Sequence, residues 1–115
     1  MELNLEELPI IDKELGIRLA GNQPDLAHDM IVMLSKGLPQ DLADINHAFT
    51  NNDYPELLRY VHKLHGAVAY CGTPRLKEVL AQIETKLKRN MKDEIPTLMQ
   101  RLQVEVHDLL CHPGI

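Results

Sequence analysis

The stretch V-H-K-L-H-G-A-V-A-Y-C-G, residues 61 to 72, carries the pattern from which the fold of the chain can be inferred. If residues 54 to 71 form one helix, at about 100° per residue, its apolar side chains fall on one narrow stripe at a and d spacing. We expect this stripe to face the core, and we expect His62 to point away from it into solvent. The stripe consists of Leu57, Val61, Leu64, Val68 and Cys71.

Small side chains surround His62 on the predicted exposed face. Leu58, Gly66 and Ala69 lie beside it on the helical wheel. His65 lies at the edge of the same side. A glycine inside a helix costs about 1 kcal/mol relative to alanine, and packing on an exposed face does not require one. Gly66 therefore indicates that the surface of another molecule approaches His62 closely.

Four further segments have helical periodicity with start and stop signals. Asp53 and Thr73 are candidate N-caps, and Pro39 falls inside the longest segment, where it predicts a kink or a short break. Connections between the segments are short, which makes neighbouring helices antiparallel. The predicted fold is all-α, an antiparallel up-down four-helix bundle with a short extra N-terminal helix, at residues 11–112 after an acidic arm at residues 1–10. The helices are predicted at about residues 12–20, 24–49, 54–71, 74–90 and 93–111.

Composition and charge limit the possible functions. The chain has 115 residues, enough for one domain with a sizeable core, and contains 12 Lys and Arg against 17 Asp and Glu. The resulting net charge of −5 argues against nucleic acid as a partner. No apolar run approaches the roughly 18 residues of a membrane span, so we expect a soluble, cytoplasmic domain without direct membrane contact. Cys71 and Cys111 fall within predicted helices, which favours free thiols in a reducing compartment.

Motifs of several enzyme classes are absent from the sequence, including the P-loop, the dinucleotide-binding glycine motif, the nucleophile elbow and the H-E-x-x-H zinc motif. A metal site has weak support. Two acid-x-x-His spacings, at residues 25–28 and 44–47, match those of di-iron bundles, but both lie on the polar sides of their helices. His62 and His65 have no closed ligand set beside them. A metal-binding bundle is therefore the third hypothesis, and we expect no metal or cofactor in this domain.

An exposed histidine has another use, as a nucleophile. Its imidazole, with a pKa of about 6.5, is largely neutral at pH 7 and can attack phosphorus through a ring nitrogen. The sequence offers nothing that would bind ATP, so the phosphoryl donor has to be another protein, whose acidic pocket would hold Mg²⁺ for the transfer. The alternative hypothesis is an incidental surface histidine in a non-catalytic helical interaction module. The residues alone leave both hypotheses open.

The same part of the chain also resembles a known family, the histidine phosphotransfer (HPt) domains. The resemblance covers about residues 11–110. It is most marked with the C-terminal HPt domain of BarA-type hybrid sensor kinases, in which H-K-L-H-G and G-x-P-R also occur. The positions that carry it are the H-K-L-H-G-A at residues 62–67, then Gly72, Arg75, Leu76, Ile83 and Glu84.

The resemblance implies a monomeric four-helix bundle in which His62 is the phosphorylated residue. Such a domain takes a phosphoryl group from a receiver aspartate of a hybrid sensor kinase and passes it to the receiver of a response regulator, within a two-component phosphorelay. It is a carrier without kinase activity or a cofactor of its own, and the Mg²⁺ belongs to the receiver. The parent chain is then a membrane-bound hybrid kinase with this domain as its cytoplasmic tail; a free-standing protein is the alternative.

Two positions depart from the common HPt pattern. Lysine is usual where this sequence has His65, and glutamine is frequent where it has Glu84. The carboxylate of Glu84 would accept the Nδ1–H of His62, but it would also repel a phosphate on Nε2. A protonated His65, or Lys77 or Lys88 on the flank of the carboxylate, would offset that repulsion, and the sequence does not decide among them. The predicted receiver-docking surface consists of Leu58, Gly66, Ala69, Lys77 and Lys88.

Overall fold

The computed structural model describes residues 5–114. In this range the chain is helical and contains no β-strand, which confirms the all-α prediction. The predicted acidic arm lies partly outside the described residues, at positions 1–4, and its boundary at residue 10 stays a prediction. The elements are the 3₁₀ turns η1 (Leu5–Glu7) and η2 (Lys92–Glu94) and the helices α1 (Lys13–Leu19), α2 (Pro24–Thr50), α3 (Tyr54–Val68), α4 (Pro74–Lys88) and α5 (Ile95–Leu110).

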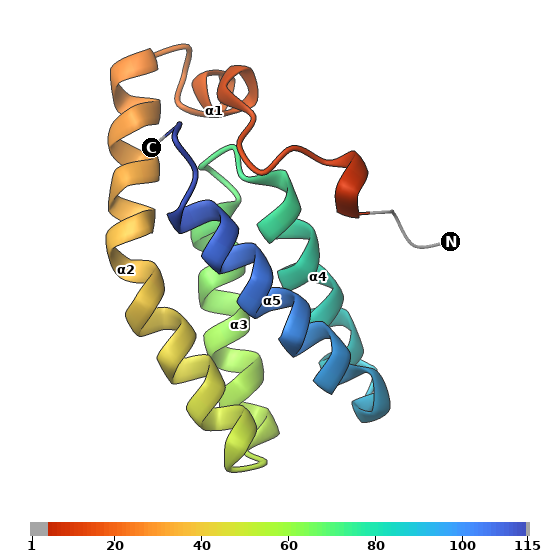
Figure 1. The fold of residues 1–115 in the computed structure, drawn as a ribbon. Coiled ribbons are helices and arrows are strands. Elements are labelled where there is room, and N and C mark those ends of the chain that lie inside the picture. The colour runs from red at the N-terminus through yellow and green to blue at the C-terminus, as the bar shows by residue number, and fades with distance from the viewer. Residues whose placement is uncertain (1–4, 115) are drawn as a thin grey trace.

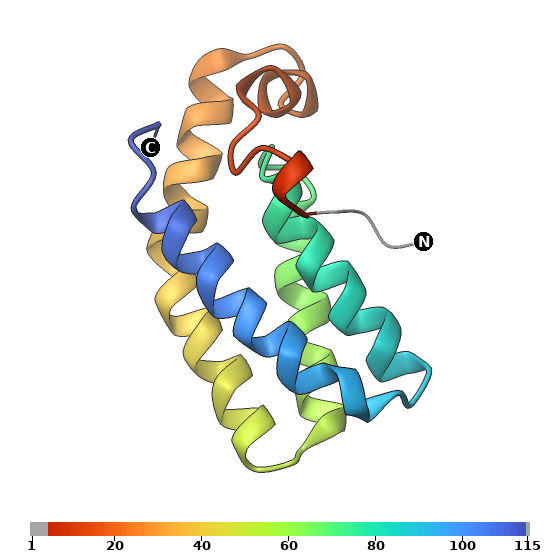
Figure 2. The ribbon, with the colours of Figure 1, turned by 45° about the vertical axis from the view of Figure 1, so that its right-hand side comes forward.

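The four long helices, α2 to α5, run alternately in opposite directions and pack side by side (Figure 1). α3 packs against α2 and α4, and α5 packs against α4 and α2, which closes the bundle. The short helix α1 contacts α2 and lies across one end of the bundle, near the turn between α3 and α4 (Figure 1, Figure 2). The predicted up-down four-helix bundle with an extra N-terminal helix is therefore confirmed.

The core is built from aliphatic side chains, as a chain with no Trp and one Phe requires. The apolar stripe predicted on α3, from Leu57 to Val68, is buried. Each such side chain contributes about 1.5–3 kcal/mol when it is removed from water. This burial sets the rotation of α3 about its axis and therefore the direction in which His62 points. The other long helices add fully buried side chains, among them Leu38, Ile45, Leu80, Ile83 and Leu102.

Helix α2 is continuous over its 27 residues, although Pro39 lies inside it. The predicted alternative of a short break is therefore wrong, whereas a kink is visible as a change in axis direction about midway along the helix (Figure 1). Proline removes one backbone hydrogen bond and crowds the preceding turn. Leu38 and Ile45 are both fully buried, so the packing of the two halves against one core offsets this cost.

The turn between α3 and α4 explains a second difference from the prediction. Helix α3 ends at Val68, so Cys71 lies in the turn and not in the helix, although it stays buried. Gly72 has a φ of +64°, and its carbonyl oxygen accepts the Asp12 N–H at 2.9 Å. A Cβ on Gly72 would lie 2.7 Å from the Asp12 carbonyl oxygen, so only glycine allows this approach of the two segments. Cys111 also lies outside its predicted helix, at the C-cap of α5, and both cysteines are free thiols.

A buried charged cluster fastens the N-terminal segment to the bundle. Glu105 on α5 is 2% exposed, and its carboxylate accepts a hydrogen bond from Arg101 Nε at 2.6 Å. Arg101 also pairs with Glu6 at 2.8 Å. Arg75 on α4 donates to the Leu8 carbonyl oxygen at 2.7 and 2.9 Å, which holds η1 beside the start of α4 (Figure 2). The predicted arm is thus packed, from residue 5 on, against α4 and α5.

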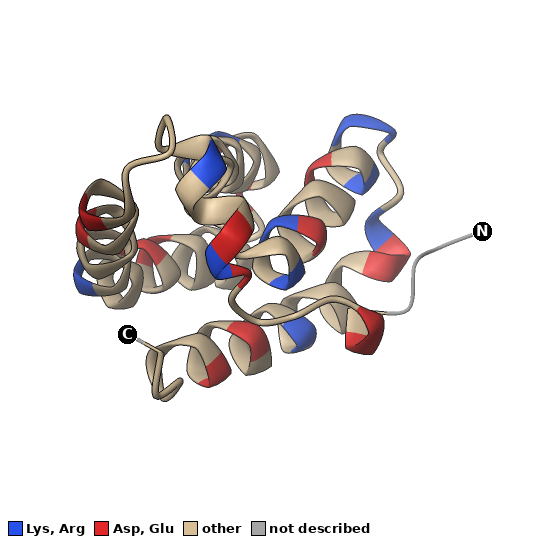
Figure 3. Ribbon diagram, turned by 90° about the horizontal axis from the view of Figure 1, so that it is seen from above, with Lys and Arg blue, Asp and Glu red and all other residues tan. Residues whose placement is uncertain are grey.

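Along the ribbon of residues 5–114, positions of Lys and Arg alternate with positions of Asp and Glu on several helices (Figure 3). Among residues 5–114, no helix is both long enough and apolar enough to cross a membrane.

Candidate functional site

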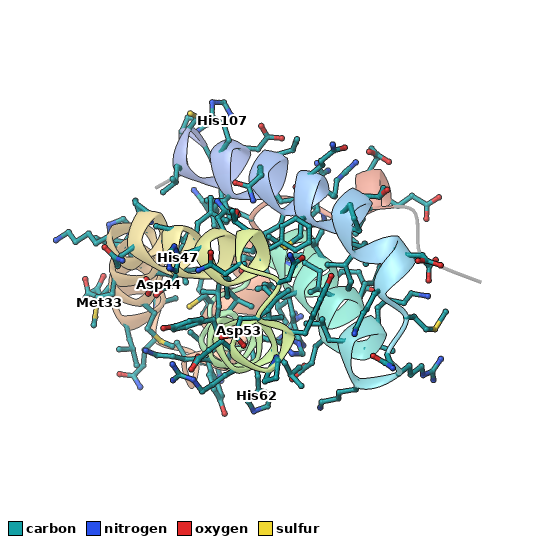
Figure 4. All side chains as sticks on the ribbon, turned by 90° about the horizontal axis from the view of Figure 1, so that it is seen from below. Met33, Asp44, His47, Asp53, His62 and His107 are labelled. Carbon is teal, nitrogen blue, oxygen red and sulfur yellow. The ribbon has the colours of Figure 1, made fainter. Side chains whose placement is uncertain are left out.

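His62 lies on the exposed face of α3, one turn before Gly66. The helix begins at Tyr54 because Asp53 caps it, accepting the Glu56 N–H at 3.2 Å. With the apolar stripe turned inward, the side chain of His62 is 71% exposed and projects away from the bundle (Figure 4). The prediction of a solvent-facing histidine is confirmed.

One carboxylate on the neighbouring helix holds this histidine in place. Oε1 of Glu84, on α4, pairs with Nδ1 of His62. Oε2 of the same carboxylate pairs with Nδ1 of His65 at 2.8 Å, and Lys88 Nζ lies 3.6 Å from Oε1. The side chain of Glu84 is only 9% exposed. The structure therefore brings His62 together with three other residues that the sequence assigns to the site.

The charge of Glu84 decides where the ring proton of His62 lies. Burial raises the pKa of Glu84, but hydrogen bonds from His62 and His65 and the charge of Lys88 outweigh it and lower this pKa below its ordinary value. Glu84 is therefore ionised at neutral pH and can only accept hydrogen bonds. It follows that Nδ1 of His62, which faces the carboxylate, carries the proton. Nε2 then has a free lone pair on the exposed side of the ring, as a nucleophile requires.

Gly66, unlike Gly72, has open space where a side chain would begin. A Cβ on Gly66 would meet no atom within 4 Å outside its own helical turn, so nothing within the molecule requires glycine there. The expectation that packing does not demand Gly66 is confirmed. Leu58 and Ala69, predicted beside it, are half-buried. Their role in docking stays a prediction.

Lys77 and Lys88, the two lysines that the sequence leaves as alternatives for offsetting the charge of Glu84, have different surroundings in the structure. Lys88 approaches Glu84, whereas Lys77, two helical turns away on α4, lines a groove together with Ala69. Leu15 of α1 also lines this groove. The sequence does not predict Leu15 as a neighbour of the site, because its position depends on how the N-terminal segment folds back. The only local signal is the i, i+4 spacing of apolar residues on α1.

The acid-x-x-His pair at residues 44–47, considered for metal binding, has other partners. His47 pairs with Asn51 at 3.0 Å, and Asp44 accepts a hydrogen bond from Gln40 at 2.9 Å. Figure 4 shows both side chains on α2, apart from His62. Within residues 5–114, no group of three or more His, Cys, Asp and Glu side chains has an arrangement that could hold a metal ion.

Known proteins are similar to this chain in sequence, and a solved domain is similar to it in fold. The sensor histidine kinase GacS of Pseudomonas protegens is 40% identical over 110 residues, which cover 90% of this chain and 12% of that protein. The histidine-protein kinase BarA of Escherichia coli K12 is 34% identical over 84 residues, which cover 73% of this chain and 9% of BarA. The crystal structure of an HPT domain from a hybrid histidine kinase of Shewanella matches with a TM-score of 0.80 and 31% identity, over 93% of this chain and 90% of that one.

The chain therefore spans about a tenth of the length of these two kinases, and nearly the whole of the solved domain. The model of the Hpt domain family matches residues 29–110, which include α3 with His62 and α4 with Glu84. The fold, the site and these matches agree, and the chain belongs to the Hpt domain family.

Proposed function

We propose that this chain is a phosphoryl carrier of a two-component phosphorelay. His62 Nε2 accepts the group from a receiver aspartyl phosphate and passes it to an aspartate of a second receiver. The observation that carries the proposal is the pairing of an exposed imidazole with a buried carboxylate, which leaves Nε2 as the free ring nitrogen. Membership of the Hpt family supports it, and the relatives, which are sensor kinases, support placing the domain within a longer hybrid kinase.

The chemistry needs little machinery on this chain. In the incoming step the Nε2 lone pair forms the N–P bond while the P–O bond to the receiver carboxylate breaks, and the outgoing step reverses this exchange with a second carboxylate. Mg²⁺ on the receiver offsets charge on the phosphoryl oxygens. Lys88 supplies positive charge 3.6 Å from Glu84, and His65 Nδ1 lies 2.8 Å from the same carboxylate. No nucleotide and no cofactor of its own are required.

Docking has to bring a receiver aspartate close to Nε2. Gly66 provides space one turn from His62, and Leu58 and Ala69 offer an apolar centre for a small, transient interface. All of these residues lie on one bundle, so a monomer suffices. The free thiols fit a reducing compartment, and we place the domain in the cytoplasm.

The test mixes the purified domain with a radiolabelled, phosphorylated receiver domain and Mg²⁺. Label should move to the domain in an acid-labile, base-stable form, and His62→Gln should abolish the transfer. His107→Gln is the matched control, because His107 is an equally exposed histidine on α5, with 75% of its side chain accessible. If no receiver labels the wild-type domain, including a receiver from the same polypeptide or operon, the non-catalytic interaction module becomes the better hypothesis.

A further inference from the structure

We infer that His107 and Cys111, near the end of α5, form half of a zinc site that a second copy of this chain completes. The pair lies apart from the proposed phosphoacceptor, and the inference does not depend on the proposed function. It departs from the expectation, drawn from the sequence, that the domain holds no metal.

The first observation is the distance between the two candidate ligand atoms. Sγ of Cys111 lies 3.7 Å from Nε2 of His107, which precedes it by one helical turn. Zinc binds an imidazole nitrogen at about 2.0–2.1 Å and a thiolate sulfur at about 2.3 Å, so two such atoms at a tetrahedral angle lie about 3.6 Å apart. Cys111 is a free, exposed thiol, and 75% of the His107 side chain is exposed. The pair therefore has the spacing and the access that a shared zinc ion requires.

The second observation is a carboxylate on the far side of the imidazole. Oδ1 of Asp108 lies 3.5 Å from Nδ1 of His107, so this nitrogen faces a carboxylate while Nε2 faces the sulfur. Zinc-ligating histidines have this arrangement, in which one ring nitrogen binds the metal and the other donates to a carboxylate or carbonyl oxygen. Carboxylate, imidazole and thiol thus follow one another in the order found around a zinc ligand.

One copy of the chain supplies only two ligands. Structural zinc sites are closed and have four protein ligands, typically Cys and His. Within residues 5–114, no group of three or more His, Cys, Asp and Glu side chains could hold a metal ion, so the other ligands have to come from another molecule. A second copy related by a two-fold axis supplies the same pair and gives a Cys₂His₂ site. Each thiol releases its proton as its sulfur binds, and the two thiolates balance the charge of Zn²⁺.

The outer face of α5 is open to such a partner. Val104 precedes His107 by three residues and Cys111 by seven, so the three side chains share one face of the helix. Val104 is 49% exposed, and contact with the second copy of α5 would cover it. His107 projects away from the bundle on the side opposite to His62 (Figure 4). A dimer bridged at this face therefore leaves both copies of His62 accessible.

The experiment adds Zn²⁺ to the whole 115-residue chain, kept reduced with a phosphine that competes weakly for metal. Light scattering should show the mass rising from 13.1 kDa to twice this value, with one zinc ion bound per two chains, and EDTA should reverse the change. Co²⁺ in place of Zn²⁺ should give the visible absorption of a tetrahedral ion and the near-ultraviolet band of cobalt–thiolate bonds.

Variants assign the ligands. Cys111→Ser should abolish the cobalt–thiolate band, and both Cys111→Ser and His107→Gln should weaken zinc-dependent dimerisation at least about tenfold, since even groups behind the ligands contribute 10–100-fold to metal affinity. Asp108→Asn should weaken zinc binding about tenfold and leave the cobalt spectrum unchanged, because the ligands stay. His47→Gln is the matched control, because His47 on α2 has Asn51 and not a thiol four residues later. It should bind zinc as wild type does, and circular dichroism checks that all variants fold.

Three results would overturn the inference. One is a chain that stays a monomer in Zn²⁺, with or without bound metal. Another is zinc binding that gives no thiolate band with Co²⁺ and persists in Cys111→Ser, because the ion then lies elsewhere, for example at the exposed His62. The third is a dimer that EDTA does not dissociate, which other contacts must hold. Wild-type affinity in Asp108→Asn would overturn the role of Asp108. No receiver or phosphate takes part, so this test and the relay assay fail separately.

Discussion

Replacing Gly66 by alanine should stabilise the bundle, although the residue lies beside the proposed phosphoacceptor. Gly66 is inside α3, where glycine is about 0.5–1 kcal/mol less favourable than alanine. A Cβ there meets open space, so no packing cost opposes the gain. For a domain of this size, a gain of about 1 kcal/mol in the free energy of unfolding raises Tm by roughly 4 °C.

Gly72→Ala is the matched control on the same stretch of sequence. The φ of +64° at Gly72 costs a residue with a side chain about 1–2 kcal/mol. Its Cβ would also lie 2.7 Å from the Asp12 carbonyl oxygen, and overpacking of this kind costs about 1–3 kcal/mol. We therefore expect a loss of about 2–5 kcal/mol for Gly72→Ala. Urea unfolding followed by circular dichroism measures both variants.

Gly66→Leu tests what the open space is for. The bundle should stay folded, because the new side chain extends into solvent beside His62. Transfer from a phosphorylated receiver should slow at least about tenfold, equivalent to about 1.4 kcal/mol lost from the docked complex. The reasoning is refuted if Gly66→Ala destabilises the bundle, or if Gly66→Leu transfers phosphate at the wild-type rate.

Three further predictions concern buried charge and the proline of α2. Arg101→Ala removes the hydrogen-bond donor of the buried Glu105 carboxylate, which keeps only Arg75 at 3.8 Å, and should cost about 1.5–3 kcal/mol in urea unfolding, whereas Arg59→Ala, in an exposed pair, should change stability little. Equal effects of the two would contradict the burial argument. The pKa of Glu84 is lowered in the folded state, so its ionised form adds stability above its unfolded pKa, and that stability is lost as the pH falls. The difference in unfolding free energy between wild type and Glu84→Gln should therefore shrink from about pH 5 to about pH 3, and a difference independent of pH would count against this linkage. Pro39→Ala restores a backbone N–H at an exposed position and should add up to about 3 kcal/mol in thermal unfolding; a loss would mean that the kink is needed for packing.

The parts of the site that sequence reasoning predicts correctly are those that local spacing determines. The apolar stripe on α3 sets the rotation of the helix, and this alone turns His62 outward. The neighbouring α4 has its own stripe, with Leu80 and Ile83 fully buried, which leaves Glu84 at the edge that faces α3. Helical periodicity therefore gives the faces on which the imidazole and the carboxylate lie, whereas their pairing at one level of the bundle follows from the family resemblance and the packing of α3 against α4.

Contacts between distant segments lie beyond that reasoning. Lys88 lies four residues after Glu84 on α4, so its approach to the carboxylate follows the local i, i+4 spacing, whereas the groove that Lys77 lines with Ala69 and Leu15 depends on α1 folding back. The pairing of Arg101 with Glu6 cannot be read from either segment alone, because it depends on the N-terminal segment folding back. The choice between a kink and a break at Pro39 depends on packing in the same way, because a local hydrogen-bond rule does not include the core contacts that hold both halves of α2.

The stretch that resembles the family signature combines two kinds of residue with opposite orientations. His62 and Gly66 face outward, where one offers a lone pair and the other leaves space. Gly72 and Arg75 act inward, because the first admits the Asp12 backbone and the second holds the carbonyl of Leu8. These inward contacts set the N-terminal segment and α1 beside the groove that Ala69 and Lys77 line. A chain with only the outward residues would still present an imidazole, but it would lack the groove that α1 forms beside Ala69 and Lys77.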